Sequence, residues 1–88
     1  MYKIILHKNA VKFYRNIDDK LRKRISRAID SISQNPYYHI HIKKLHGELS
    51  HMYRYRMGDI RIIYEIHEDI KTIRIKTIEA RGNAYKRK

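Results

Sequence analysis

Arginine residues at alternating positions in the C-terminal half of the chain are the side chains best suited to chemistry. Arg54 and Arg56 alternate with apolar residues, Arg61 lies on the next predicted strand, and Arg74 and Lys76 alternate with isoleucine on the strand after that. Side chains two apart on a β-strand share a face, so these cations would lie together on the face opposite the core. Five cations repel one another unless an anion binds them. A solvated outer face of an antiparallel sheet is the alternative interpretation.

Guanidinium groups fixed on one face favour phosphoryl-transfer chemistry. In-line displacement at phosphorus develops negative charge on the equatorial oxygens, which arginine stabilises with bidentate hydrogen bonds. No metal is needed where cations supply this stabilisation. The sequence has three isolated glycines and no glycine-rich phosphate loop. We therefore expect a site that uses no metal and no cofactor.

Six histidines raise two alternative kinds of site, a metal centre and a histidine-based ribonuclease. His39 and His41 would share one face of an extended segment, but no third ligand follows at a recognisable spacing. His46 or His51 could act near Lys44 in acid–base cleavage of RNA. The sequence does not place these side chains together, so the second alternative stays open.

The elements that must position the cations follow an α+β order. Residues 2–7 predict a strand, and residues 53–81 predict a meander of three antiparallel strands. Between them, two amphipathic segments predict a helical hairpin, with Asn9 as the first N-cap and Asp18-Asp19 capping the second helix. The second helix should end at Asn35-Pro36, because the residue before proline disfavours the α conformation.

Apolar residues on the predicted strands and helices indicate one core, with both helices packed on one side of the sheet. The residues expected to face inward are Ile60, Ile62, Tyr64, Ile66, Ile73, Ile75 and Thr77 from the strands, and Leu21, Ile25, Ile29 and Ile32 from the second helix. Residues 37–50 are expected to form a connector that turns at Gly47. A chain of 88 residues suits one domain with a small core, and we assign residues 1–88 to it.

The charge balance predicts a polyanionic or acidic partner. Twenty-one lysines and arginines against nine acidic residues give a net charge of +12. Four of these cations form a row along the second predicted helix, opposite its apolar stripe: Lys20, Lys23, Arg24 and Arg27. This row is either a surface that contacts a nucleic-acid backbone or a solvated helix face.

Sequence features that report on compartment point to the cytoplasm. The chain has no cysteine, which excludes disulfides and fits a reducing environment. No apolar run approaches the roughly 18 residues of a membrane span. The first residues lack the apolar length and small-residue cleavage site of a signal peptide. We expect a cytoplasmic protein that does not bind membranes.

Four short motifs, in order along nearly the whole chain, resemble the RelE toxin family of the RelE/ParE superfamily. The helical hairpin ends near Asn35-Pro36, and Lys44-Leu45-His46-Gly47 matches the K-L-x-G of the family. The segment 58–64 matches its G-x-x-R-[LIV]-[LIV]-Y, and Arg81 to Tyr85 match its R-x-x-x-Y. Each motif is weak alone, and their order and spacing make the resemblance specific.

The resemblance implies the toxin of a type II toxin–antitoxin system. Such toxins are ribosome-dependent endoribonucleases that cleave mRNA in the decoding site and are silenced by a cognate RelB-like antitoxin in a hetero-oligomer. By position, Arg61 would stabilise the pentacovalent phosphate, Arg81 would contact the scissile phosphate, and Tyr85 would stack on or activate the substrate. Tyr85 could instead be a packing residue in the C-terminal tail.

Two further points follow from the resemblance. Arg54 and Arg56 stand where some family members have lysine, and guanidinium does not deprotonate, which argues against a base role for either. The ParE branch of the superfamily shares the architecture and implies a gyrase inhibitor without RNA chemistry. A non-catalytic RNA-binding domain would also explain the charge. Both remain alternatives to the nuclease.

Overall fold

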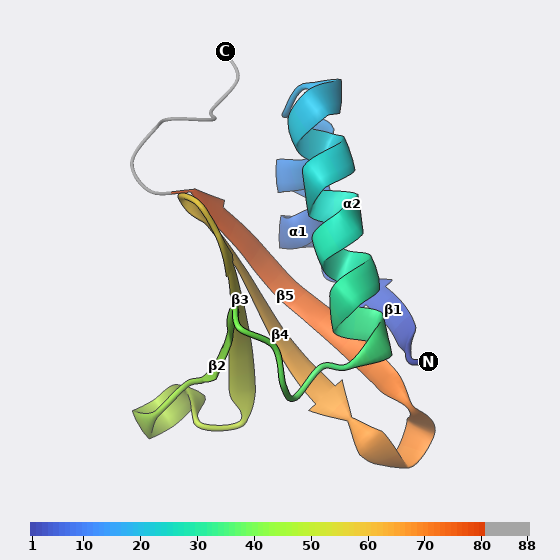
Figure 1. The fold of residues 1–88 in the computed structure, drawn as a ribbon, viewed down its shortest axis with the longest axis vertical. Coiled ribbons are helices and arrows are strands. Elements are labelled where there is room, and N and C mark those ends of the chain that lie inside the picture. Colours follow the sequence, from blue (N-terminus) through green and yellow to red (C-terminus); the bar gives the residue numbers. More distant parts are fainter. Residues whose placement is uncertain (81–88) are drawn as a thin grey trace.

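A five-stranded mixed sheet with two helices on one face makes up residues 1–80, the part of the chain that the computed structural model describes (Figure 1). The elements in chain order are β1 (Lys3–Leu6), α1 (Lys8–Arg15), α2 (Asp19–Gln34), β2 (Ile42–Lys44), β3 (Met52–Met57), β4 (Ile60–His67) and β5 (Thr72–Ala80). Short 3₁₀ turns at Gly47–Leu49 and Glu68–Ile70 precede β3 and β5. The predicted α+β class, with the helices on one side of the sheet, is confirmed.

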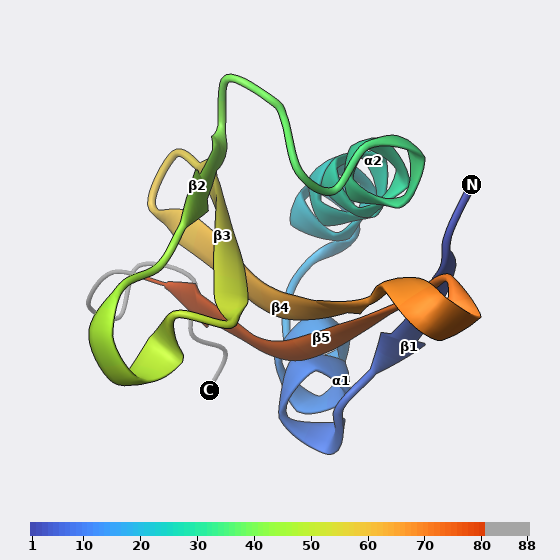
Figure 2. The same cartoon turned by 90° about the horizontal axis from the view of Figure 1, so that it is seen from below.

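The strand order β1-β5-β4-β3-β2 places β1 and β2 at opposite edges of the twisted sheet (Figure 2). β1 pairs in parallel with β5, and every other pairing is antiparallel. The prediction that residues 37–50 form only a connector was wrong, because β2 lies within them. Pairing of Ile42 with Tyr55 and of Lys44 with Tyr53 forms this strand. Three residues of strand are too few to show alternation in the sequence.

Helix boundaries follow the capping residues. His7, rather than the predicted Asn9, caps α1, because the His7 ring nitrogen Nδ1 accepts the Asn9 N–H at 3.2 Å. Asp18 caps α2 as predicted, with its carboxylate accepting the Leu21 N–H at 2.9 Å. The end of α2 at Gln34 is also as predicted. Neither helix within residues 1–80 is long and apolar enough to cross a membrane.

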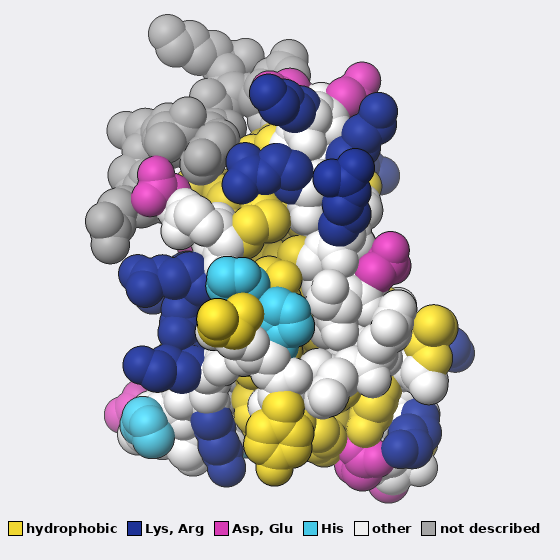
Figure 3. Space-filling view, viewed as in Figure 1, with side chains coloured by type: hydrophobic (Ala, Val, Ile, Leu, Met, Phe, Trp, Pro, Cys, Tyr) yellow, Lys and Arg dark blue, Asp and Glu magenta, His cyan; other side chains and the backbone are white. Residues whose placement is uncertain are grey.

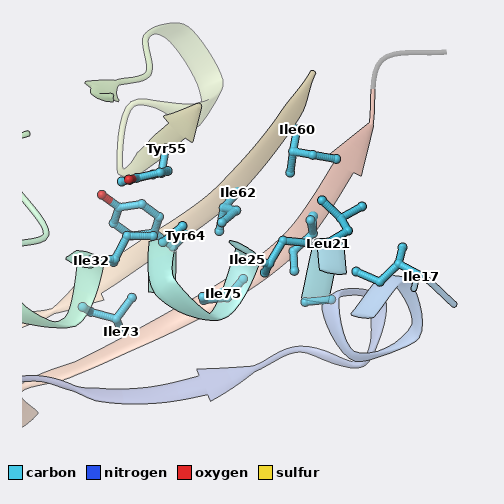
Figure 4. Close-up of a cluster of buried hydrophobic side chains, with 13 residues drawn as sticks. Ile17, Leu21, Ile25, Ile32, Tyr55, Ile60, Ile62, Tyr64, Ile73 and Ile75 are labelled. Carbon is cyan, nitrogen blue, oxygen red and sulfur yellow. The ribbon is translucent and has the colours of Figure 1, made fainter. Parts of the chain in front are cut away.

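The hydrophobic core lies between α2, α1 and the helix-facing side of the sheet (Figure 4). The predicted inward-facing residues that are buried are Leu21, Ile25, Ile32, Ile60, Ile62, Tyr64, Ile73 and Ile75. Ile29 and Ile66 are half-buried and pack against this cluster. Tyr64 is fully buried, and its hydroxyl donates to the Pro36 carbonyl at 2.7 Å, which ties β4 to the segment after α2.

A β-bulge between β4 and β5 changes which residues of β5 face the core. Ile63 pairs with Thr77, but the next residue, Tyr64, pairs with Ile75, so β5 has one extra residue at Lys76. A bulge shifts the side-chain alternation by one position. The predicted inward position of Thr77 was therefore wrong. Thr77 lies on the outer face, and Ile78, 3% exposed, takes the core position.

Glu68 joins three segments at the end of the sheet where β4 turns into β5. Its carboxylate accepts hydrogen bonds from Tyr2 at 2.7 Å, Tyr37 at 2.8 Å and the Lys71 ammonium at 2.6 Å. These hydrogen bonds, of which the one from Lys71 has the largest effect, lower the pKa of Glu68 from its ordinary 4.5 to about 2. The hydrogen bond between Tyr37 and Glu68 also raises the pKa of Tyr37 to about 12. The N-terminus, the segment after α2 and the β4–β5 connection are thus held by one carboxylate.

Candidate functional site

Two arginines lie directly opposite each other on the outer face of the sheet. The antiparallel register pairs Arg56 of β3 with Arg61 of β4, and it pairs Arg61 with Glu79 of β5 on its other side. Both arginines are exposed. Directly opposed like charges destabilise a strand pair. Glu79 offsets part of this repulsion, with its Oε1 2.7 Å from Nη2 of Arg61.

Arg54 completes a group that we call the arginine cluster: Arg54, Arg56 and Arg61. Arg54 is half-buried and pairs across strands with Ile63 on one side and Lys43 of β2 on the other. Burial, together with the charges of Arg56 and Arg61, lowers the pKa of Arg54. Burial is the larger cause of this shift, and the two neighbouring positive charges add to it, so the three arginines form one cationic surface. Such a surface is suited to binding a phosphate or another anion.

A hollow opens beside the cluster at the β3–β4 turn. Its lining residues are Arg56, Gly58, Asp59, Arg61, Glu79 and Ala80. Gly58 makes the tight turn possible, because its φ of +59° lies in the left-handed region that favours glycine. A Cβ placed on Gly58 would be 3.9 Å from Nη2 of Arg24. Arg24 belongs to the row of four cations predicted on the second helix, which we call the α2 basic row: Lys20, Lys23, Arg24 and Arg27. This row therefore reaches the edge of the hollow.

The α2 basic row is exposed along its whole length, as its sequence spacing predicted. Figure 3 shows basic side chains along α2 and a second basic group over β2 and β3, with histidines and apolar side chains between the two. The two groups come from separate elements. The surface therefore offers more than one place for a polyanion to bind.

Arg74 and Lys76 do not join the arginine cluster. They lie near Glu65, which pairs with Arg74 across strands and approaches its Nη1 at 3.9 Å. Burial opposes ionisation of Glu65, but a 2.9 Å contact with His67 and the charges of Lys76 and Arg74 lower its pKa overall. The five predicted cations thus form two groups on the outer face, each with its own carboxylate: Glu79 beside Arg61 in the first and Glu65 beside Arg74 in the second.

Two of the histidines pair with each other, and others lie beside Glu65. His39 and His41 lie side by side as predicted, with ring centroids 5.2 Å apart, and both contact the Tyr55 ring. His51 approaches Glu65 at 3.7 Å, and no side-chain hydrogen bond joins it to Lys44 within residues 1–80. In the same part of the chain, no three metal-ligating side chains come together.

Two of the predicted site residues cannot be compared with the structure, and two residues that the structure places at the site were not predicted. Arg81 and Tyr85 lie outside the described residues, so their assignments remain predictions. Glu79 and Lys43 were missed. Glu79 reaches Arg61 only because of the bulge, and Lys43 joins Arg54 only through β2. The sole indication in the sequence was the three-residue step from Ile75 to Ile78.

Comparison with known proteins identifies the family. Residues 4–85 match the model of the ParE toxin of type II toxin–antitoxin systems. The chain belongs to this family. The prediction from sequence of a RelE-like toxin in the RelE/ParE superfamily is confirmed, since two similar proteins, each 29% identical to this chain, are named RelE.

Three relatives illustrate the similarity of this toxin to known proteins. The curated RelE1 protein of Methanocaldococcus jannaschii is 29% identical over 87 residues, covering 97% of this chain and 96% of the relative. RelE in the RelE–RelB complex of Pyrococcus horikoshii is 29% identical with a TM-score of 0.77, covering 94% and 98%. The isolated RelE toxin of E. coli has a TM-score of 0.79 at 14% identity, covering 93% and 86%, and it supports the fold alone.

Proposed function

We propose that this toxin is a ribosome-dependent endoribonuclease that cleaves mRNA in the decoding site and so inhibits translation. The observation that carries the proposal is the cross-strand pair of Arg56 and Arg61, with Arg54 beside it, on an exposed face. A phosphate placed between two opposed guanidinium groups replaces their repulsion with charge-assisted hydrogen bonds. These bonds strengthen as negative charge grows on the phosphate in the transition state.

The reaction needs only groups that RNA and protein side chains supply. The ribose 2′-oxygen attacks the adjacent phosphorus and loses its proton, while the bond from phosphorus to the 5′-oxygen breaks and that oxygen gains a proton. The products are a 2′,3′-cyclic phosphate and a 5′-hydroxyl. Arg61 stabilises the pentacovalent phosphate in this proposal, and Arg54 and Arg56 hold it in line.

The remaining assignments in this proposal follow the sequence prediction. Arg81 contacts the scissile phosphate, and Tyr85 stacks on or activates the nucleotide. Arg74 and Lys76 bind the RNA backbone away from the cleaved bond. The α2 basic row contacts a second stretch of nucleic-acid backbone, either mRNA or ribosomal RNA. No metal or cofactor takes part.

The relatives favour a nuclease over a gyrase inhibitor. The Methanocaldococcus and Pyrococcus proteins, each 29% identical to this chain, bear the name RelE. The motifs around Arg61 and Arg81 to Tyr85 point the same way. A non-catalytic RNA-binding domain would explain the charge but not the R-x-x-x-Y ending.

The proposal includes a RelB-like antitoxin that forms a hetero-oligomer with this toxin. The Pyrococcus relative was crystallised as a RelE–RelB complex. With a net charge of +12, this chain should attract an acidic, largely disordered antitoxin segment that folds on contact. Carboxylates of that segment would lie near the arginine cluster. Translation takes place in the cytoplasm, so the proposal places the toxin there.

One pair of assays tests the proposal. Purified toxin is incubated with mRNA-programmed ribosomes, and primer extension maps any cut; in parallel, it is incubated with gyrase and supercoiled DNA. We expect cuts in the mRNA codon at the ribosomal A site, with 2′,3′-cyclic phosphate ends, and no effect on gyrase. Inhibition of gyrase without RNA cleavage would support the ParE alternative. RNA binding without cleavage would support the non-catalytic alternative.

A further inference from the structure

Within residues 1–80, Arg61 is the only member of the arginine cluster that a carboxylate contacts. Oε1 of Glu79 lies 2.7 Å from Nη2 of Arg61, as a hydrogen-bonded ion pair. Among these residues, Arg54 and Arg56 have no ion pair of this kind. The residue to which the proposed function gives the central role is thus already bonded to an anion.

The bulge at Lys76 is what places Glu79 beside Arg61. Ile73 and Ile75 face the core, and unbroken alternation would send Glu79 toward the same side. The extra residue reverses the alternation, so Ile78 turns inward and Glu79 turns outward. The register then sets Glu79 directly across from Arg61. Bulges are often found next to functional sites, where they redirect a side chain.

The ion pair can open. The Arg61 and Glu79 side chains are 55% and 44% exposed, so water reaches both. An exposed ion pair of this type contributes little to stability, so little is lost when it opens. Glu79 also lines the same hollow as Arg56 and Arg61. An anion that enters the hollow meets Glu79 at the guanidinium it would bind.

We infer that Glu79 is an internal counter-ion that competes with the RNA phosphate for Arg61 and so lowers the affinity of this site for RNA. The inference rests on the proposed function, in which Arg61 binds the scissile phosphate. Binding requires Glu79 to release Nη2 or to share it. A phosphate held by Arg56 as well can displace Glu79, whereas a phosphate held by Arg61 alone gains less. The ion pair thereby favours an RNA that engages both arginines.

Direct binding of a short single-stranded RNA tests this role without ribosomes. The RNA has 2′-O-methyl riboses and cannot be cleaved by 2′-oxygen attack, and fluorescence anisotropy measures its affinity between about 50 and 300 mM salt. Glu79→Gln should bind roughly fivefold more tightly at low salt, the effect of about one unit charge close to the site. Its plot of log affinity against log salt should steepen by about 0.7, the value for one additional phosphate neutralised on a single strand.

Two variants separate loss of the contact from loss of charge. Glu79→Asp keeps the net charge but withdraws the carboxylate by one methylene, so tighter binding by this variant reports the lost contact itself. Asp59→Asn removes one negative charge from the same hollow without touching Arg61. We expect a gain for Glu79→Asp and a smaller gain for Asp59→Asn than for Glu79→Gln. Urea unfolding of each variant confirms that it is folded.

Arg61→Gln, made alone and together with Glu79→Gln, completes the test as a double-mutant cycle. If Glu79 competes at Arg61, Glu79→Gln gives no more than the Asp59→Asn gain once Arg61 is absent. If Arg61→Gln leaves RNA affinity unchanged in both backgrounds, the proposed phosphate site is wrong. If Arg61→Gln weakens binding but Glu79→Gln and Asp59→Asn give equal gains, the phosphate site stands. In that case the competing role of Glu79 is overturned, and the ion pair only fastens β4 to β5.

Discussion

Arg56 and Arg61 lie directly opposite each other on β3 and β4, held there by the backbone register of the sheet. Their separation is set by main-chain hydrogen bonds, which anchor both Cα atoms before any anion arrives. The backbone is therefore already in place when a phosphate binds between them, and only side chains, including those of the Arg61–Glu79 ion pair, have to rearrange. Groups held in place in advance are a main source of transition-state stabilisation. The fold thus maintains a repulsive pair that an RNA phosphate would relieve.

The α2 basic row should contribute to RNA binding independently of the arginine cluster. Replacing all four of its cations with glutamine removes four charges that could neutralise phosphates. If the row contacts single-stranded backbone, the plot of log affinity against log salt should flatten by up to about 2.8, at about 0.7 per contact. Affinity for ribosomes and for RNA, measured across salt concentrations, checks this prediction.

A matched variant controls for the change in net charge. It also replaces four exposed cations with glutamine, but on β1 and α1 rather than on α2: Lys3, Lys8, Lys12 and Arg15. Equal loss of affinity in the two variants would mean that only the overall field of the protein matters. The α2 basic row would then be a solvated helix face.

Tyr64→Phe should destabilise the fold by about 1–3 kcal/mol. The change removes a buried hydroxyl that donates to the Pro36 carbonyl, and this buried acceptor is left without a partner. Burial, with smaller effects of Tyr53 and Tyr55, raises the pKa of Tyr64, so the hydroxyl remains a donor at neutral pH. Urea unfolding measures the loss. Tyr38→Phe, at a side chain 81% exposed, should change stability little, and equal losses would contradict the account.

Stability should depend on Glu68 in the acid range. Its pKa is about 2 in the folded protein and about 4.5 ordinarily, so the folded state favours the charged carboxylate. The stabilisation is fully present above about pH 4.5 and is lost as the pH falls toward 2. Glu68→Gln should therefore be less stable than the wild type at pH 7, by a difference that shrinks on acidification.

Urea unfolding at pH 7, 4 and 2.5 follows that difference. Glu48→Gln serves as the control, because it removes an exposed carboxylate from the 3₁₀ turn before β3. Its difference from the wild type should be small and should vary little with pH. A Glu68→Gln difference that stays constant between pH 7 and 2.5 would show that the three hydrogen bonds do not depress this pKa.

Sequence periodicity was sufficient for the parts of the fold that alternate regularly. The period of two in β4 and the helical spacing in α2 correctly predicted that Ile62 and Ile25 meet in the core. β2 could not be predicted, because its three residues form a strand only through pairing with β3. The bulge could not be predicted because Ile73, Ile75 and Thr77 are each two residues apart, which is the spacing of a strand without a bulge.

For the candidate site, the sequence predicted the residues of β3 and β4 but not those whose positions depend on pairing with β5. Arg54, Arg56 and Arg61 share a face because the alternation of β3 and β4 is unbroken throughout their pairing, from Met52 with Glu65 to Met57 with Ile60. Glu79 was missed because its position depends on the bulge. The separation of Arg74 from the arginine cluster could not be foreseen either, because it depends on the pairing of Glu65 with Arg74 across two strands. Register between strands is a tertiary property, and a single strand does not encode it.

Cleavage of mRNA on programmed ribosomes by Arg61→Ala tests the central claim most directly. Removal of a group that stabilises the transition state typically lowers the rate by roughly 10²-fold or more, and we predict a loss of that size. Arg15→Ala, at an exposed arginine of α1, should cleave at the wild-type rate and controls for the loss of one positive charge. Both variants should unfold in urea as the wild type does. A folded Arg61→Ala protein that cleaves at the wild-type rate would contradict the assignment of the arginine cluster as the catalytic site.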